Sequence, residues 1–314
     1  MRYIRLCLVA ALFVAAPSVH AADDILPHQL TLKLDGHTRL NRTIDTDSVL
    51  NESGVIHHAT SHRDYSEVLT PTATGFTVTR TLTKFAITPA TAPDALINTP
   101  WWEAKMLDMP KVVLTAAPNL QTAAIDNWPE IEARMIAAFP ANGSADDRAA
   151  HNALMGAMTP VGAVAVVDGQ SSMMAVARKY PLVVGKPVEE SFSRQGPMGG
   201  GTLDFTNTYT LTRWDVAGDT AEFDFHSAPD NTSLSTYMLD VLLPMVTPAG
   251  TPQDQIDAVK ADMHLTLDTT CHVVASISSG LVTHGGCTIE VTVHVMSYEQ
   301  SRKMTSVVSE SFAP

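Results

Sequence analysis

Alternating apolar and polar residues run through much of the chain and predict antiparallel β-strands. These segments share frequent Val and Thr, and they cover residues 28–34, 54–69, 75–87, 201–214, 221–227, 263–268, 272–278 and 288–296. Turns rich in Gly, Asn and Asp join them. This spacing favours a meander or a half-barrel over β-α-β units.

Helix signals interrupt the strands at a few places. The clearest predicts a helix over residues 128–139, where Asn127 can cap the helix and Pro129 stands in its first turn. In this segment Ile131, Met135 and Phe139 lie on one side of the helix, which is the spacing of a helix that faces a core.

Three further segments have helical signals. One begins at Ser144, another begins at Thr251, and residues 234–243 form a helix that Pro244 is expected to close. The apolar residues 161–167 fit either a buried helix or a strand.

The order of these elements predicts an α+β fold, a mostly antiparallel curved sheet or half-barrel with a few packed helices. We expect residues 22–160 to form a first antiparallel sheet with helices and residues 161–314 to form a second. No residue-level repeat relates the two segments, so a single domain is the alternative.

The N-terminal residues 1–21 have the pattern of a secretory signal peptide. Arg2 and Arg5 precede a short apolar run, and small residues up to Ala21 offer a cleavage position. The run is too short to span a bilayer, so no transmembrane segment is expected. Cleavage would release a periplasmic or secreted protein that begins at Ala22.

Composition narrows the classes of partner. The formal net charge is −13, and removal of residues 1–21, which contain two Arg and no acidic residue, would make it −15. Nucleic acid and anionic membrane surfaces are therefore not expected partners. The 45% hydrophobic and 17% charged residues are typical of a folded chain. The sequence does not define the oligomeric state.

Two cysteines outside the signal segment predict a disulfide bond. Cys271 and Cys287 lie eight residues on either side of Ser279. A turn at residues 278–280 would place them opposite each other on two antiparallel strands, and an oxidising compartment would join them. A turn at residues 284–286 would separate them, and two buried free thiols would then be the alternative.

Histidines form the densest candidate metal cluster at His57, His58 and His62. On a helix, His58 and His62 could share one ion. The surrounding Ser, Thr and Val favour a strand, on which these two would stand about 13 Å apart at ~3.3 Å per residue, too far for one ion. Four scattered histidines lack a zinc motif, and we predict no metal site at His264, His272, His284 and His294.

Signatures of catalysis and of cofactor binding are missing from the sequence. There is no GxSxG or SxxK motif, and the glycines at 199–201 lack the spacing of a phosphate loop and precede a strand. We therefore predict no catalytic residue and no cofactor. A site assembled from distant strands is the alternative, with His62, Asp64 and His226 as candidates.

Trp101 and Trp102 are the candidate ligand-binding residues. Adjacent indoles do not easily face one core, and a surface indole beside Met106 and Met109 would suit an acyl chain, an aromatic ligand or a partner. The alternative is that both indoles pack under a loop.

Three stretches resemble segments common in exported bacterial proteins. They are residues 114–135, residues 180–200 with their Tyr-Pro-Leu and Pro-Met-Gly-Gly turns, and residues 267–280. In its order of elements, the chain resembles the periplasmic lipoprotein-carrier fold, a curved antiparallel half-barrel capped by helices. That resemblance implies shelter for an acyl chain, and it identifies no ligand residue.

These observations favour an exported, non-catalytic protein that binds or carries an apolar or amphiphilic ligand, such as a lipid. One alternative is a secreted hydrolase whose site is assembled from distant strands. Another is a structural or adaptor protein of the envelope that uses a sheet edge or the tryptophan pair.

Overall fold

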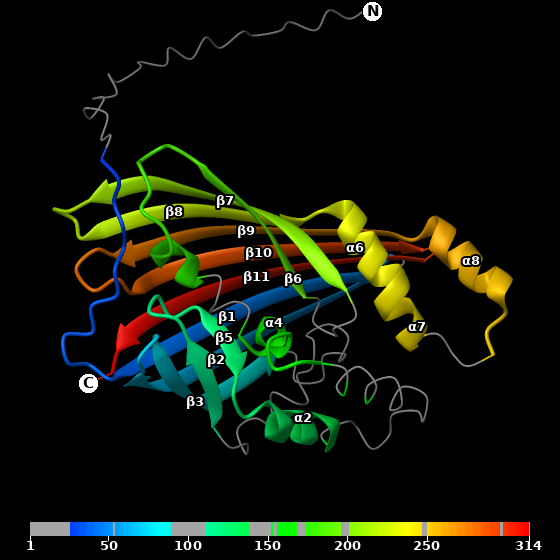
Figure 1. Cartoon of the computed structure of the whole chain (residues 1–314), viewed down its shortest axis with the longest axis horizontal. Helices are drawn as coiled ribbons and strands as arrows, with labels where there is room; N and C mark the ends of the chain where they lie inside the picture. The colour runs from blue at the N-terminus through cyan, green and yellow to red at the C-terminus, as the bar shows by residue number, and fades with distance from the viewer. Residues whose placement is uncertain are drawn as a thin grey trace, which may run out of the picture.

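The computed structural model describes residues 26–52, 54–88, 111–137, 152, 156, 158–168, 174–195, 201–246, 250–295 and 298–313. Its strands form one open antiparallel sheet in the order β5-β4-β3-β2-β1-β11-β10-β9-β8-β7-β6. The first and the last strand pair with each other near the centre of the sheet, from Leu40 opposite Phe312 to Glu52 opposite Gln300. Figure 1 shows this arrangement.

The strands are long in the centre of the sheet and short at the edge formed by β5. Their bounds are β1 (Arg39–Glu52), β2 (Val55–Pro71), β3 (Phe76–Thr88), β4 (Val112–Ala116), β5 (Thr122–Ile125), β6 (Val188–Gln195), β7 (Thr202–Asp215), β8 (Thr220–Pro229), β9 (His264–Ser276), β10 (Val282–Val295) and β11 (Tyr298–Phe312).

Short helices accompany the sheet, and α6 and α7 lie at the end of the sheet where β7 begins (Figure 1). The helices are α2 (Trp128–Ala137), α4 (Ala163–Val167), the 3-10 helix η2 (Ala175–Arg178), α6 (Asn231–Tyr237), the π-helix η3 (Met238–Leu242), α7 (Leu243–Val246) and α8 (Gln253–Asp262). Within the described residues, no helix combines the length and the apolarity that crossing a membrane requires.

The two faces of the sheet differ. On β1, Leu40, Arg42 and Ile44 are buried, whereas the alternate residues Asn41 and Asp45 are exposed. Because neighbouring residues of a strand point to opposite faces, burial defines an inner face that carries the core. The outer face is rich in Thr, Ser, Asp and His.

The fold class predicted from the alternation is confirmed, since the sheet is antiparallel, open and accompanied by packed helices. The predicted helices at Trp128 and Thr251 correspond to α2 and α8. The ambiguous segment 161–167 contains the helix α4. The helix predicted to begin at Ser144 falls largely on residues outside those described.

Several boundaries differ from the prediction. Residues 28–34 form no strand and contribute only an isolated bridge between His28 and Leu182. Residues 263–268 and 272–278 belong to one strand, β9. The helix begun by α6 continues past Pro244 through a π-helical turn into α7. Proline removes one hydrogen-bond donor, and a π-helical turn just before it accommodates that loss.

Both predicted sheet segments contribute to the same sheet. Strands β1 to β5 come from residues before 160, strands β6 to β11 come from residues after it, and β1 pairs with β11 along its length. The boundary at residue 160 stays a prediction about domains.

Charged side chains are buried at one end of the inner face. Arg42 donates to Glu67 at 2.8 Å and to Glu310 at 2.9 Å. Arg80 of β3 donates to the same Glu67 at 2.6 Å. These four residues link β1, β2, β3 and β11 through side chains that are each less than a tenth exposed.

Two more members of this ionic cluster come from the segments that cover the sheet. Asp168, at the end of α4, accepts hydrogen bonds from Arg80 at 2.5 Å and from Thr122. Arg178, at the end of η2, donates to Glu310 and to the backbone oxygen of Gly280. With three arginines and three carboxylates the ionic cluster is neutral, and it fixes α4 and η2 to the inner face.

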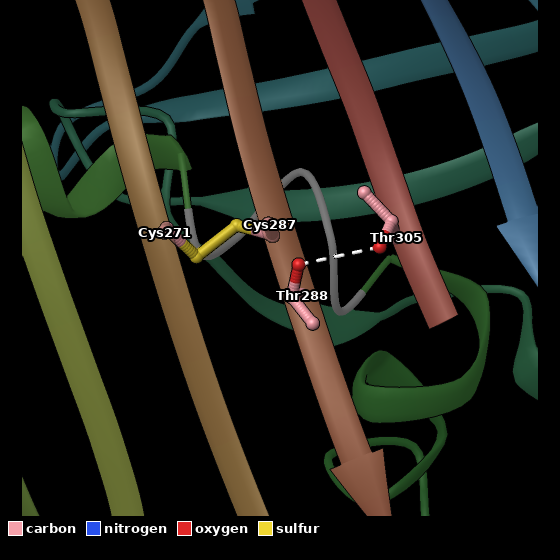
Figure 2. The surroundings of a disulfide bond; sticks show 4 residues. All are labelled: Cys271, Cys287, Thr288 and Thr305. Carbon is pink, nitrogen blue, oxygen red and sulfur yellow. Dashed lines mark hydrogen bonds between the residues drawn. A yellow bond between two sulfur atoms is a disulfide. The ribbon is translucent and has the colours of Figure 1, made fainter. Parts of the chain in front are cut away.

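The predicted disulfide is confirmed. Cys271 of β9 lies opposite Cys287 of β10, their Cα atoms are 4.1 Å apart and their sulfur atoms are bonded. The hairpin turn is the one centred near Ser279. Figure 2 shows the bond beside the outer-face pair Thr288 and Thr305. The bond therefore links two neighbouring central strands within the buried core.

Candidate functional site

An apolar surface covers the inner face at the end of the sheet that carries α6. We call it the apolar shelf, and it consists of Phe192, Leu203, Phe205, Leu265 and Leu267. Phe192 stacks on Phe205 across the β6–β7 pair, with ring centroids 5.6 Å apart. Leu203 and Phe205 are buried, whereas Phe192, Leu265 and Leu267 are half-buried.

Strand β10 continues the apolar surface toward the centre of the sheet. Val291 lies opposite Leu267, and Val293 lies opposite Leu265. Both valines are half-buried. The alternate positions of the same two strands carry the polar residues Thr266, Asp268, Glu290, Thr292 and His294. The apolar character is therefore confined to the inner face.

The helix α6 and the turn η3 pack on the shelf through Leu234, Tyr237, Met238 and Val241. The start of α6 is tied to β7, because the backbone N–H of Asp230 donates to the oxygen of Asp204 at 2.7 Å. The Asp230 side chain caps the helix by accepting from the N–H of Ser233 at 2.9 Å. The same serine hydroxyl accepts from the N–H of Asp204.

A polar cluster adjoins the shelf, and Glu190 of β6 is its centre. The Glu190 carboxylate accepts from Lys179 at 2.8 and 2.9 Å, from the Tyr180 hydroxyl at 2.5 Å and from the Tyr209 hydroxyl at 2.8 Å. The Asn207 amide nitrogen donates to the Tyr209 hydroxyl at 2.8 Å. We call these five residues the Glu190 cluster.

The protonation of this cluster follows from its contacts. Burial raises the pKa of Glu190, but the hydrogen bonds from Lys179 and the two tyrosines outweigh it and hold that pKa below its usual value. Burial and the neighbouring carboxylate raise the pKa of Tyr209. The cluster therefore contains a carboxylate, an ammonium group and neutral hydroxyls at neutral pH.

Among the described residues, Asn207 has no hydrogen-bond partner for one of its polar atoms. The side chain is 7% exposed, and its Oδ1 atom makes no hydrogen bond to the described residues. Tyr209 has one hydroxyl proton, which it donates to Glu190, so its oxygen accepts from the Asn207 amide nitrogen. This fixes the orientation of the amide and leaves Oδ1 on its other side.

A small apolar cavity lies next to this cluster, on the side of η2. Its volume is about 10 Å³, and Ala177, Leu182, Tyr209, Phe223, Phe225 and Val273 line it together with Asp224. That volume holds about one water molecule. An acyl chain therefore cannot bind there without a rearrangement.

The ligand-binding residues predicted from sequence, Trp101, Trp102, Met106 and Met109, lie outside the described residues. Of the candidate hydrolase residues, the structure brings together His62 and Asp64, whose side chains are 3.1 Å apart on the outer face. His226 is on β8 and contacts Asp268 at 2.6 Å. Five strand spacings, roughly 24 Å, separate β2 from β8, so His226 does not join the other two.

The histidines of the outer face pair with aspartates across neighbouring strands. His58 contacts Asp47 at 3.0 Å, and His62 contacts Asp45 at 2.7 Å. The hydrogen bond to Asp45 raises the pKa of His62. Both histidines lie on the strand β2, as the composition around them predicts.

In the C-terminal part, the ring of His264 lies 6.3 Å from that of His294, and His272 contacts Asp224 at 2.8 Å. The four scattered histidines therefore do not meet at one place. Among the described residues, no group of three or more His, Cys, Asp or Glu side chains has the geometry of a metal site.

Sequence reasoning did not identify the shelf or the Glu190 cluster. The alternation at residues 203–205 and 265–267 was visible, but it indicates strands and not which strands share a face. Glu190 and Asn207 lie opposite each other on β6 and β7, whereas Lys179 follows η2 and contacts Glu190 from a separate segment.

Comparisons with known proteins identify no family, because no family model and no curated protein matches the chain. A structure that describes lipid-protein interactions in lipovitellin is similar over 88% of this chain, with a TM-score of 0.43 and 8% identity. This chain spans about a quarter of that lipovitellin chain, 26% of its length.

Two crystal structures of OprD, one of them described as from Pseudomonas aeruginosa, align with TM-scores of 0.15 and 0.16 and 6% identity. They cover 90% and 93% of this chain and 62% and 65% of their own chains. At these TM-scores, none of the three structures supports an inference about function.

Proposed function

We propose that the protein is an exported binding or carrier protein that holds an apolar or amphiphilic ligand on the inner face of its sheet, at the apolar shelf. The observation that carries the proposal is the half-buried apolar surface of Phe192, Leu265 and Leu267, confined to one face and one end of the sheet. The signal sequence predicted at residues 1–21 supports export.

The energetics of burial favour an apolar occupant. Removing apolar surface from water contributes about 25 cal/mol per Å². A chain laid over the partly exposed leucines and valines would gain this contribution from several side chains at once. The helix α6 is seven residues long, and it packs on the same surface that the ligand would cover. Ligand binding would therefore shift α6 and η3.

Native mass spectrometry with lipid extraction tests the proposal on protein purified from the exported fraction. We expect a co-purifying lipid or other apolar species, and we expect Leu267→Asn to reduce it because a polar group would enter the shelf. The control is Val68→Asn, which makes a similar change at a half-buried aliphatic residue on the outer face.

The same experiment tests the predicted tryptophan pair. Loss of the bound species in Trp101→Ala and Trp102→Ala would add these residues to the site. A ligand-free mass that stays unchanged after incubation with envelope lipids would contradict the carrier function.

A further inference from the structure

We propose that Asn207 receives a hydrogen bond from the polar head of the ligand, so that the preferred ligand is an amphiphile with an uncharged, hydroxyl-bearing head. This inference rests on the proposed function of the apolar shelf and specifies its ligand class.

The position of Asn207 connects the shelf with the Glu190 cluster. Along the inner face of β7, Phe205 of the shelf precedes Asn207 and Tyr209 follows it. The amide nitrogen is turned toward Tyr209. The amide oxygen therefore lies on the side of the amide away from Tyr209. An apolar chain on the shelf would bring its head group to this boundary.

The Oδ1 atom of Asn207, which has no hydrogen-bond partner among the described residues, favours a head group that can donate a hydrogen bond. A buried acceptor without a hydrogen bond costs about 1 to 3 kcal/mol, and a ligand that donates a proton to it recovers this cost. A hydroxyl group can donate to Oδ1. A carboxylate has no proton to donate and would place its oxygens against another acceptor.

The charge of the surroundings also disfavours an anionic head. The positive charge of Lys179 is already balanced by Glu190, at 2.8 Å. Tyr180 and Tyr209 donate their hydroxyl protons to the same carboxylate. The cluster therefore offers no uncompensated cation to a carboxylate or a phosphate.

Two probes with the same acyl chain and different heads test this inference, namely 1-monooleoylglycerol and oleate at pH 8. We expect the wild-type protein to bind monooleoylglycerol roughly tenfold more tightly, measured by native mass spectrometry titration. Asn207→Leu keeps the branched shape of the side chain and removes the acceptor together with the amide donor to Tyr209. We expect this variant to bind the two probes within about twofold of each other.

The control is Asn41→Leu, the same change at an exposed position of the outer face. It should retain the tenfold preference. Thermal unfolding of each variant shows whether it is folded, and Asn207→Ser, which keeps a hydroxyl acceptor, should restore part of the preference if Asn207→Leu is destabilised.

The outcomes separate this inference from the proposed function. Equal binding of both probes by the wild-type protein would overturn the role of Asn207 and leave the carrier function standing. A preference that survives in Asn207→Leu would also overturn it. Failure of both probes to bind would contradict the inference and the carrier function together.

Discussion

At the scale of single residues, the buried charges have the clearest energetic consequence. Glu310 accepts hydrogen bonds from Arg42, from Arg178 and from the backbone N–H of Val282. Removing one partner of a buried ion pair leaves an uncompensated charge away from water. The neutrality of the ionic cluster should therefore matter more to stability than any single hydrogen bond in it.

We predict that Glu310→Gln lowers the free energy of unfolding by about 3 to 5 kcal/mol, because two buried arginines lose the carboxylate they share. Urea unfolding at pH 7 measures this change. The control is Glu290→Gln, which breaks an exposed ion pair with Lys303 and should cost less than about 0.5 kcal/mol. Similar losses in both variants would contradict the role assigned to the ionic cluster.

The same carboxylates predict a loss of stability in acid. Burial raises the pKa values of Asp168 and Glu310. Arg80 and Arg42 outweigh this effect at Asp168, and Arg178 and Arg42 outweigh it at Glu310, so that both pKa values lie below their usual values. A carboxyl group with a depressed folded-state pKa contributes stability above its unfolded-state pKa, near 4, and loses it as the pH falls through the folded-state pKa.

The contribution of these carboxylates to the free energy of unfolding should therefore be nearly constant from about pH 7 to 5 and should fall below about pH 4. Urea unfolding as a function of pH measures it. In Glu310→Gln the fall should be smaller, because one of the titrating groups is gone. An unchanged pH profile in that variant would show that other carboxylates cause the acid unfolding.

Residue spacing predicted the disulfide, because Cys271 and Cys287 flank one turn at equal distances. It could not predict the Glu190 cluster. Lys179 and Glu190 are 11 residues apart, and Tyr209 is 19 residues beyond Glu190. Contacts of this kind depend on how η2 and β6 lie against β7, and that information is not local.

At the scale of elements, the helix over the shelf is the part that ligand binding should move. Its start is fixed to β7 at Asp204, and the π-helical turn before Pro244 interrupts regular helical hydrogen bonding. A Cβ atom at Gly201 would lie 3.4 Å from the Val241 side chain. A bond between these two positions would hold the middle of this helix against the start of β7.

We predict that the double variant Gly201→Cys and Val241→Cys, once oxidised, loses at least tenfold in affinity for monooleoylglycerol and regains it when the new disulfide is reduced. The buried Cys271–Cys287 bond serves as an internal reference, since the wild-type protein receives the same treatment. Full affinity in the oxidised variant would show that the ligand binds without movement of the helix.

Strand prediction failed for β1 and β11 for a physical reason. Apolar residues do not alternate with polar ones in these strands, because the inner face of β1 carries Arg42, Thr46 and Ser48, which are buried. The facing residues of β11 include Ser306 and Glu310. Polar residues on both faces remove the alternation, although in the fold Arg42 donates to Glu310 and the hydroxyl groups of Thr46 and Ser306 pair.

At the scale of the whole molecule, the two faces of one sheet differ in polarity. The outer face is polar from β3 to β7, and the inner face divides between a compact core, the ionic cluster and the half-buried shelf. The alternation predicted the antiparallel sheet and its polar face. The pairing of β1 with β11 could not be predicted, because it joins the two ends of the chain.

Methyl NMR on the complex with 1-monooleoylglycerol can determine which face of the sheet holds the acyl chain. We predict intermolecular nuclear Overhauser effects from the acyl chain to the methyl groups of Leu203, Leu265 and Leu267, and none to Val68 and Val307 on the outer face. Effects at the outer-face valines, or a bound chain without effects at the three leucines, would contradict the assignment of the ligand to the inner face.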